Sequence, residues 1–127
     1  MADFYDAGVE GLLDQSLNWL TDDWRVALLQ RGYRFNPAHR TFSDVAAHVN
    51  GASDTLEGRG ISGRDASAEK TYLLATKPAY SDTMVVYRHS RDPAQARLLL
   101  CAPISPVHPV AGQRIDTNWP DGLVFSL

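Results

Sequence analysis

The chain has 127 residues, of which 44% are hydrophobic and 21% are charged, and its formal net charge is −3. This composition is ordinary for a folded globular protein and excludes a wholly disordered chain. The length suits one domain, so we predict a single domain over residues 1–127. The negative charge argues against direct binding of nucleic acid, because a dedicated binder normally carries a basic face.

The single cysteine and the N-terminal residues further restrict the class of protein that the chain can belong to. The lone Cys101 excludes an internal disulfide and a cysteine cluster for zinc. Its apolar surroundings predict a small buried side chain rather than a nucleophile. The first residues carry acids where a secretory signal needs positive charge, and no apolar run approaches the ~20 residues of a membrane span. We therefore expect a protein assembled in a cytoplasm, with no membrane partner.

The periodicity of residues 3–20 predicts an amphipathic helix that Asp3 caps. Gly8 and Gly11 weaken this helix by about 1 kcal/mol each relative to alanine, and they permit close approach to a neighbour. The expected apolar stripe consists of Phe4, Leu12, Leu13, Leu17 and Leu20.

Residues 23–31 predict the first strand. Its alternation places Trp24, Val26 and Leu28 on one face. The opposite face carries Ala27 and Leu29, and the second of these interrupts a simple apolar and polar alternation. A strand with apolar residues on both faces is covered on both sides.

The next stretch is irregular. Residues 32–40 predict a loop with a turn at Asn36-Pro37, and residues 41–49 a short helix capped by Thr41 or Ser43. Residues 50–67 are rich in Gly, Ser and Asp and predict a loop.

Short runs rich in Val, Leu, Tyr and Ile follow and predict strands over 70–75, 83–88, 97–102, 114–118 and 123–127. Asp92-Pro93 lies in the loop of an expected hairpin, and the prolines of 103–113 predict an extended loop or an edge segment. The fold class is therefore α+β: an N-terminal helix followed by a mainly antiparallel β-sheet or a small β-barrel or sandwich.

Gly58, Gly60 and Gly63 form a G-x-G-x-x-G pattern in LEGRGISGRD. A dinucleotide site needs a buried strand just before this pattern and a helix beginning at its last glycine, and neither flank provides them. The glycines therefore serve the backbone, and we expect a flexible loop that becomes ordered on a partner. No cofactor is predicted.

No catalytic or metal site is predicted either. The histidines, His39, His48, His89 and His108, lack the spacing of metal ligands. No serine lies in a G-x-S-x-G context. The carboxylates lie mostly in predicted turns, where aspartate bonds to its own backbone, although an acid and base pair among them stays open.

The N-terminal third carries a composite pattern: a helix of type Y-x-x-G-x-x-x-L, an acidic turn, a strand of type (I/W)-(K/R)-V-A-L-L, a Y-x-F-(D/N)-x-x-H loop and an F-S-D-V segment, one residue shorter than the F-x-S-D-V of the pattern. It resembles the start of a family of small bacteriophage virion proteins. The matching residues are Tyr5, Gly8, Leu12, Trp19, Asp22, 24–29, Tyr33, Phe35, Asn36, His39 and 42–45.

The resemblance extends to the C-terminus. A strand ending in tyrosine before a polar hairpin is present in MVVYRHSRDPAQARLLLCAPI. The family's closing W-x-x-D-G-(I/L) pattern is matched by Trp119, Asp121, Gly122 and Leu123, with one residue fewer between Trp119 and Asp121. The family's terminal leucine is shifted by one position, to Leu127. In the middle of the chain, Ile61 replaces an aromatic residue and Gly63 a basic residue of the family's glycine segment.

The resemblance implies a non-enzymatic structural component of a tailed-phage virion, with no catalytic residues to carry over. The expected role is a capsid decoration or minor capsid protein on the capsid exterior, bound to the major capsid protein and self-associating on the particle. The alternatives are a tail or head-tail connector component and, from another class, a small-molecule-binding enzyme. The expected contact regions are the first residues, the 50–67 loop and the 103–112 loop, with Phe4, Tyr5, Arg59, Arg64, Pro106, Val107 and Pro109 as candidate interface residues.

Overall fold

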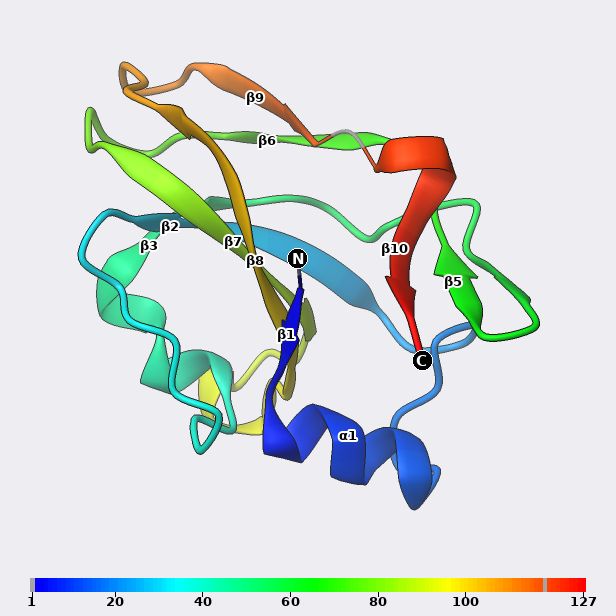
Figure 1. Ribbon diagram of the computed structural model, residues 1–127. Helices are drawn as coiled ribbons and strands as arrows, with labels where there is room; N and C mark the ends of the chain where they lie inside the picture. Colours follow the sequence, from blue (N-terminus) through cyan, green and yellow to red (C-terminus); the bar gives the residue numbers. More distant parts are fainter. Residues whose placement is uncertain (1, 118) are drawn as a thin grey trace.

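The computed structural model describes residues 2–117 and 119–127 (Figure 1). Its largest sheet has the strand order β1-β8-β7-β2-β3, a second sheet the order β10-β5-β4, and β6 pairs with β9. Every pairing is antiparallel. The strands are β1 (Asp3–Phe4), β2 (Trp24–Gln30), β3 (Val49–Ala52), β4 (Gly60–Ser62), β5 (Asp65–Ser67), β6 (Thr71–Leu74), β7 (Ser81–Arg88), β8 (Leu98–Val107), β9 (Arg114–Thr117) and β10 (Leu123–Ser126).

The helical elements are short. Helix α1 spans Asp6–Leu13, and the single-turn 3₁₀ helices are η1 (Phe42–Asp44), η2 (Ala46–His48), η3 (Pro93–Gln95) and η4 (Pro120–Gly122). Figure 1 shows β6 and β9 across one side of the five-stranded sheet and α1 at the opposite end. The expected α+β class with a mainly antiparallel sheet is confirmed, and no closed barrel forms within the described residues.

The prediction that β2 is covered on both faces is confirmed. Val26 and Leu28 belong to a core cluster on one face, together with Trp19 and Trp24. Ala27 and the neighbouring Leu29 belong to a second cluster on the other face, under α1 and the 33–49 segment. Strand β2 lies between β7 and β3, and both of its faces are buried. Apolar residues therefore occupy both faces of β2.

The predicted helix over 3–20 is wrong at both ends. Asp3 does not cap a helix, because it pairs with Cys101 as part of β1. The helix is only eight residues long, and Gln15 follows it with φ 66°, which interrupts helical geometry. Leu13 and Leu20 are 81% and 50% exposed, so the expected stripe does not continue to residue 20.

The loop prediction for residues 50–67 is also wrong, because strands β3, β4 and β5 occupy half of this segment. The turn between β4 and β5 has Gly63 at φ +60°, whereas Arg64 has a negative φ. Glycine at the first central position followed by an ordinary residue is typical of the two-residue hairpin turn of type II′. The conformational role inferred for Gly63 is confirmed, but within a hairpin rather than a flexible loop.

The remaining local predictions hold in outline. The 41–49 region forms η1 and η2, with Thr41 at the N-cap position and its N–H donating to Asp44 Oδ2 at 3.1 Å. Asp92 Oδ1 accepts the N–H of Ala94 at 3.0 Å in the β7–β8 connection. Strand β8 continues through two prolines to Val107, and its pairing with β7 becomes irregular there. The proline segment is thus an edge, one of the two structures expected.

Candidate functional site

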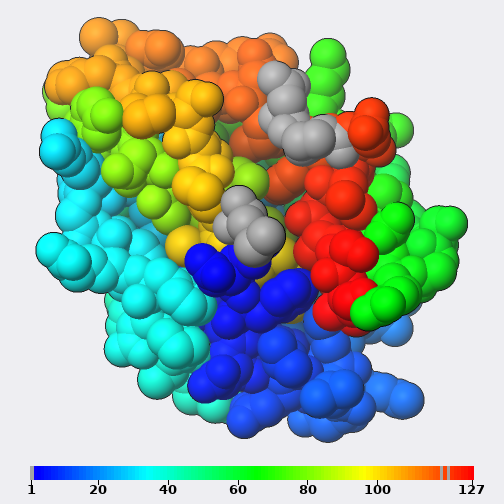
Figure 2. Space-filling view, viewed as in Figure 1, coloured from blue at the N-terminus to red at the C-terminus, as the bar shows by residue number. Residues whose placement is uncertain are grey.

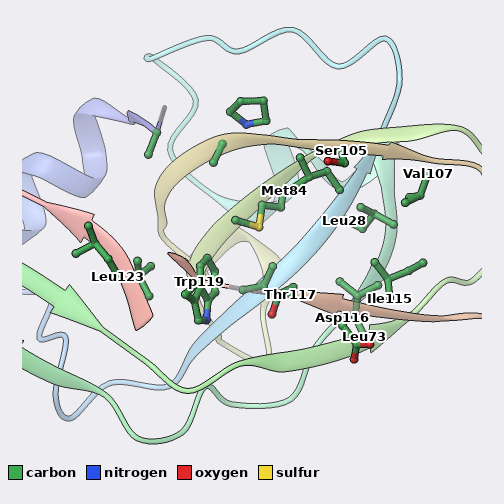
Figure 3. A pocket seen from close by; sticks show the side chains of 16 residues that line it. Leu28, Leu73, Met84, Ser105, Val107, Ile115, Asp116, Thr117, Trp119 and Leu123 are labelled. Carbon is green, nitrogen blue, oxygen red and sulfur yellow. The ribbon is translucent and has the colours of Figure 1, made fainter. Parts of the chain in front are cut away.

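A cavity of about 520 Å³ opens between the second half of β8 and β9, and we call it the slot (Figure 3). Its floor and walls are predominantly aliphatic. Its apolar lining includes Val26, Leu28, Leu73, Met84, Ile115 and Val124. The volume lies within the roughly 300–1,000 Å³ of ordinary binding pockets. The slot is therefore a concave feature of a size at which a binding function can be argued.

The slot follows from where strand pairing stops. Among residues 2–117 and 119–127, strand β1 covers the edge of β8 only opposite Leu100 and Cys101. Beyond that point the described part of the chain pairs β8 with β7 alone, and the register between Thr83–Pro103 and Ser81–Val107 is irregular. Proline lacks an N–H, which makes continued pairing along this edge unfavourable. The walls formed by β8 and β9 consequently remain apart.

Two of the polar side chains that line the slot, those of Asp116 and Thr117, are already paired, and the exposed Ser105 also lines it. Thr117 Oγ1 donates to the Thr71 carbonyl at 3.1 Å, and Asp116 Oδ1 accepts from Arg114 Nε at 2.9 Å. No histidine is among the residues that line it. Acid and base catalysis needs a titratable group aimed at the reacting atoms. The residues that line the slot offer mainly apolar contact instead.

The outer edge of β9 carries free backbone groups. The N–H of Ala75 donates to the Gln113 carbonyl, so Gln113 faces β6. Backbone groups alternate between the two sides of an antiparallel strand, and Arg114 and Asp116 therefore point away from β6. No further strand pairs with β9 within residues 2–117 and 119–127. One wall of the slot thus ends in unpaired donors and acceptors.

A second feature is a chain of aromatic hydroxyls beneath α1. The Tyr5 hydroxyl lies 2.6 Å from that of Tyr33, which in turn lies 3.0 Å from His39 Nδ1. Phe35 packs on the Tyr5 ring with centroids 5.0 Å apart. The fold thereby brings together four residues of the virion-protein pattern, and they attach the 33–39 segment to the start of the helix. Their role in this structure is packing.

Burial governs the acid–base properties of this cluster. It raises the pKa of the fully buried Tyr5 hydroxyl far above its ordinary value, and the hydrogen bond with Tyr33 adds to this effect. Burial likewise raises the pKa of the Cys101 thiol to about 11. A thiol held neutral is a poor nucleophile. The prediction that Cys101 is a small buried side chain is confirmed.

The hydroxyl chain predicts measurable coupling. Tyr5→Phe should lower the free energy of unfolding by about 1–2 kcal/mol, because the buried bond to Tyr33 is lost. Tyr33→Phe should lower the free energy of unfolding by a similar amount. The double variant should lower it by less than the sum of the two single effects. Urea denaturation of the four proteins tests this expectation. Additive costs would mean that the two hydroxyls stabilise the fold independently.

Two aspartates predict loss of stability in acid. Burial alone would raise the pKa of Asp23, but hydrogen bonds from Arg25 and Thr55 outweigh it and lower the pKa. The N–H groups of Arg40 and Thr41 lower the pKa of Asp44. A lowered folded-state pKa gives stability that is present above the ordinary value and lost as the pH falls through the folded-state value.

We therefore expect the free energy of unfolding to decrease below about pH 4, near the ordinary aspartate pKa. Asp44→Asn should flatten this dependence, because asparagine does not titrate. Urea titrations between neutral and strongly acidic pH measure the effect. An unchanged slope in the variant would contradict the assignment of Asp44.

Three of the candidate interface residues are turned inward. Tyr5 and Pro109 are buried, so neither offers contact surface to a partner. Arg59 donates through Nη1 to the carbonyls of Trp19 and Asp22, which attaches the β4 region to the preceding loop. Its guanidinium is used within the fold. The sequence could not show this, because an arginine beside glycines resembles any exposed cation.

The other candidates are accessible to different degrees. Arg64 and Pro106 are exposed. Phe4 is half-buried against Phe125, with ring centroids 5.5 Å apart, and Figure 2 shows the first residues packed beside β10. Val107 is half-buried and lines the slot. The structure therefore does not bring the candidates together into one surface. Sequence reasoning missed the slot, whose lining comes from segments far apart in the chain.

The histidines are dispersed. His39 and His48 both pack on Tyr33, and His108 lies against Tyr80. Over residues 2–117 and 119–127, no group of three or more His, Cys, Asp or Glu side chains could hold a metal ion. Among the same residues, no helix has the length and apolar character that crossing a bilayer requires.

Comparisons with known protein families, curated proteins and solved structures find no match for the chain.

Proposed function

We propose that this protein is a non-enzymatic structural component of a tailed-bacteriophage particle, and specifically a decoration or stabilising minor capsid protein. It would bind the major capsid protein on the outside of the shell after assembly in the host cytoplasm. The observation that carries the proposal is the position of the residues that resemble the virion family. Tyr5, Tyr33, Phe35 and His39 converge on one cluster beneath α1.

The architecture of that pattern supports a structural role. Two tryptophans of the pattern, Trp19 in the turn before β2 and Trp24 at the start of β2, are buried and pack together with ring centroids 5.4 Å apart. Gly8 is buried where α1 meets the β8 backbone. Residues that define a family through packing, rather than through a reactive site, are typical of a protein whose task is to present surfaces.

The chemistry of the slot favours a structural protein over a small-molecule-binding enzyme. Its walls are aliphatic, and the Asp116 and Thr117 side chains already have partners. An enzyme pocket would instead combine convergent titratable groups with space for a substrate.

The proposed mechanism is mechanical. Each copy would bury apolar surface against the shell and against neighbouring copies, and repetition over the lattice would supply avidity. A standard interface buries about 1,600 Å² in total. Aromatic and aliphatic side chains outside the core are available for such contacts: Tyr72, Leu74 and Val110 are 45%, 52% and 65% exposed around the β6–β9 pair. Arg114 of β9 contacts one of these side chains: its guanidinium lies 4.1 Å from the centre of the Tyr72 ring.

Particles that lack the gene test the proposal. We expect their heads to lose DNA at a lower temperature than wild-type heads, and added purified protein to restore the difference. Heads that withstand heat equally well would overturn the decoration role. Electron microscopy of wild-type particles supplies the second measurement. Many copies on the head support decoration, whereas a few copies at the portal or along the tail support the alternative of a connector or tail component.

A further inference from the structure

We propose that the slot is filled by an extended segment of a partner protein, which adds a strand to the free edge of β9 and inserts alternate apolar side chains into the cavity. That the partner is the major capsid protein rests on the proposed function. The binding mode itself rests on four properties of the slot: its volume, its free backbone groups, its paired polar side chains and the charge around it.

The volume leaves room for side chains from outside. The slot holds about 520 Å³ beside a floor of fully buried side chains, among them Val26 and Leu28. Aliphatic walls without apolar neighbours lose contacts that a packed interior would make. Filling the slot with apolar groups would therefore stabilise the complex by burial from water.

The backbone specifies the form of the occupant. Arg114 and Asp116 direct their N–H and C=O groups away from β6, and this edge of β9 forms one wall of the slot. A strand added there would pair with those groups, and its side chains would alternate between the slot and solvent. On the opposite wall, Pro103 offers no N–H. The added strand is thus expected to pair with β9 rather than with β8.

The paired polar side chains argue against a small polar molecule. Such a ligand needs a few polar side chains aimed into its pocket. Here Asp116 holds Arg114, and Thr117 holds Thr71. Apart from the exposed Ser105 hydroxyl, the hydrogen-bonding groups without a partner at the slot belong to the backbone of a strand edge, and another strand complements these groups best.

The charge near the slot indicates which residues should flank the apolar positions of the partner segment. Asp3 adjoins the lining residue Ala2, Asp121 lies between the lining residues Trp119 and Leu123, and Asp116 itself lines the slot. All three aspartates are exposed. Arg114 offsets one of these charges through its ion pair with Asp116. Lysine or arginine on either side of the apolar positions would complement the remaining negative charge.

The test uses a synthetic peptide of alternating pattern, KVTVTVK with blocked ends, and the purified protein. We expect the peptide to slow amide hydrogen exchange at Arg114 and Asp116 by about tenfold when its concentration is ten times its Kd. Added salt should weaken binding, since exposed charges are screened. A peptide of the same composition with its valines adjacent should protect these amides much less.

Two kinds of variant localise the effect. Ala102→Trp should reduce peptide affinity at least about tenfold, which corresponds to 1.4 kcal/mol, because the indole would occupy the slot. Ala94→Trp, at an exposed site in η3, should leave affinity unchanged. Asp116→Pro removes both the outward N–H and the Asp116 carboxylate from the lining. It should weaken binding more than Asp116→Asn, which also removes the charge of this side chain but keeps the N–H. Circular dichroism verifies that each variant is folded.

Other outcomes overturn the inference. Binding of the apolar dye anilinonaphthalene sulfonate in the slot without peptide protection would assign the slot to a small molecule. Protection that rises with protein concentration alone would assign it to a second copy of this chain. Cross-linking of β9 to the capsid protein in particles tests the partner. If the peptide binds but this cross-link is absent, the strand-binding site is supported and the major capsid protein is excluded as its partner. The two proposals can therefore fail separately.

Discussion

Replacing Gly8 by alanine should lower the free energy of unfolding by about 2–3 kcal/mol, although alanine is intrinsically the better helix former by about 1 kcal/mol. A Cβ at this position would lie 2.6 Å from the Leu99 carbonyl oxygen and 2.8 Å from Leu99 Cα. Both atoms belong to the backbone of β8, so α1 would have to move away from the sheet. The Tyr5 N–H bond to Leu99 O, at 3.0 Å, would be disturbed as well.

Gly60→Ala is the matched control. A Cβ there would meet Ser67 Oγ at 3.1 Å, and that side chain can rotate. We expect a change within about 1 kcal/mol. Urea denaturation of both variants makes the comparison. If Gly8→Ala were as stable as wild type, the close approach of α1 to β8 would not be a requirement of the fold.

Replacing Asn50 by aspartate should destabilise the protein by about 3–5 kcal/mol at neutral pH, the cost of leaving a buried charge uncompensated. Asn50 is fully buried. Its Nδ2 donates to the carbonyls of Lys77 and Ala79, and its Oδ1 accepts the N–H groups of Thr76 and Lys77. One asparagine thereby fixes the turn between β6 and β7. A carboxylate would place a second oxygen against those carbonyls.

The loss of stability caused by Asn50→Asp should become smaller as the pH falls toward about 4, near the ordinary aspartate pKa. Burial beside carbonyl oxygens raises the pKa of the new carboxyl, and the protonated form can donate to one carbonyl again. Asn18→Asp is the control, because Asn18 Oδ1 only accepts, from the N–H groups of Leu20 and Thr21. It should change stability by no more than about 0.5 kcal/mol. Equal, pH-independent costs for both variants would refute this account.

Local pattern predicts the central strands well. The positions of β2, β6, β7 and β9 follow from short apolar runs between turn residues, and coverage of both faces of β2 follows from Ala27 and Leu29. These features depend on side chains close together in sequence, which is where periodicity carries information.

The errors concern contacts between distant segments. Residues 60–67 are rich in glycine and polar residues, yet they form a hairpin because β10 pairs with β5, with Ser126 opposite Asp65. Strand β1 is two residues long and exists only through β8. The stripe of the predicted helix ends early because a left-handed residue, Gln15, follows α1. The pairings of β10 with β5 and of β1 with β8 leave no local signal, whereas the β4–β5 turn has one in Gly63-Arg64.

The candidate site was less predictable than the fold. The slot arises where β1 stops, where β8 meets Pro103 and where β9 lacks an outer neighbour, and each of these is a property of the sheet. Val107 is the candidate interface residue that lines it. Exposure could not be inferred for Tyr5 and Pro109, which the fold buries.

The pairing of β1 with β8 has a consequence for synthesis on the ribosome. Asp3 pairs with Cys101 and Phe4 with Leu100, so the first strand has no partner until most of the chain has been translated. Until then its neighbour α1 also lacks the β8 backbone against which Gly8 packs. Contacts between such distant segments form slowly, and unpaired edges favour association with other chains. The nascent protein therefore completes its main sheet late, and chaperones that shield apolar segments should raise its yield.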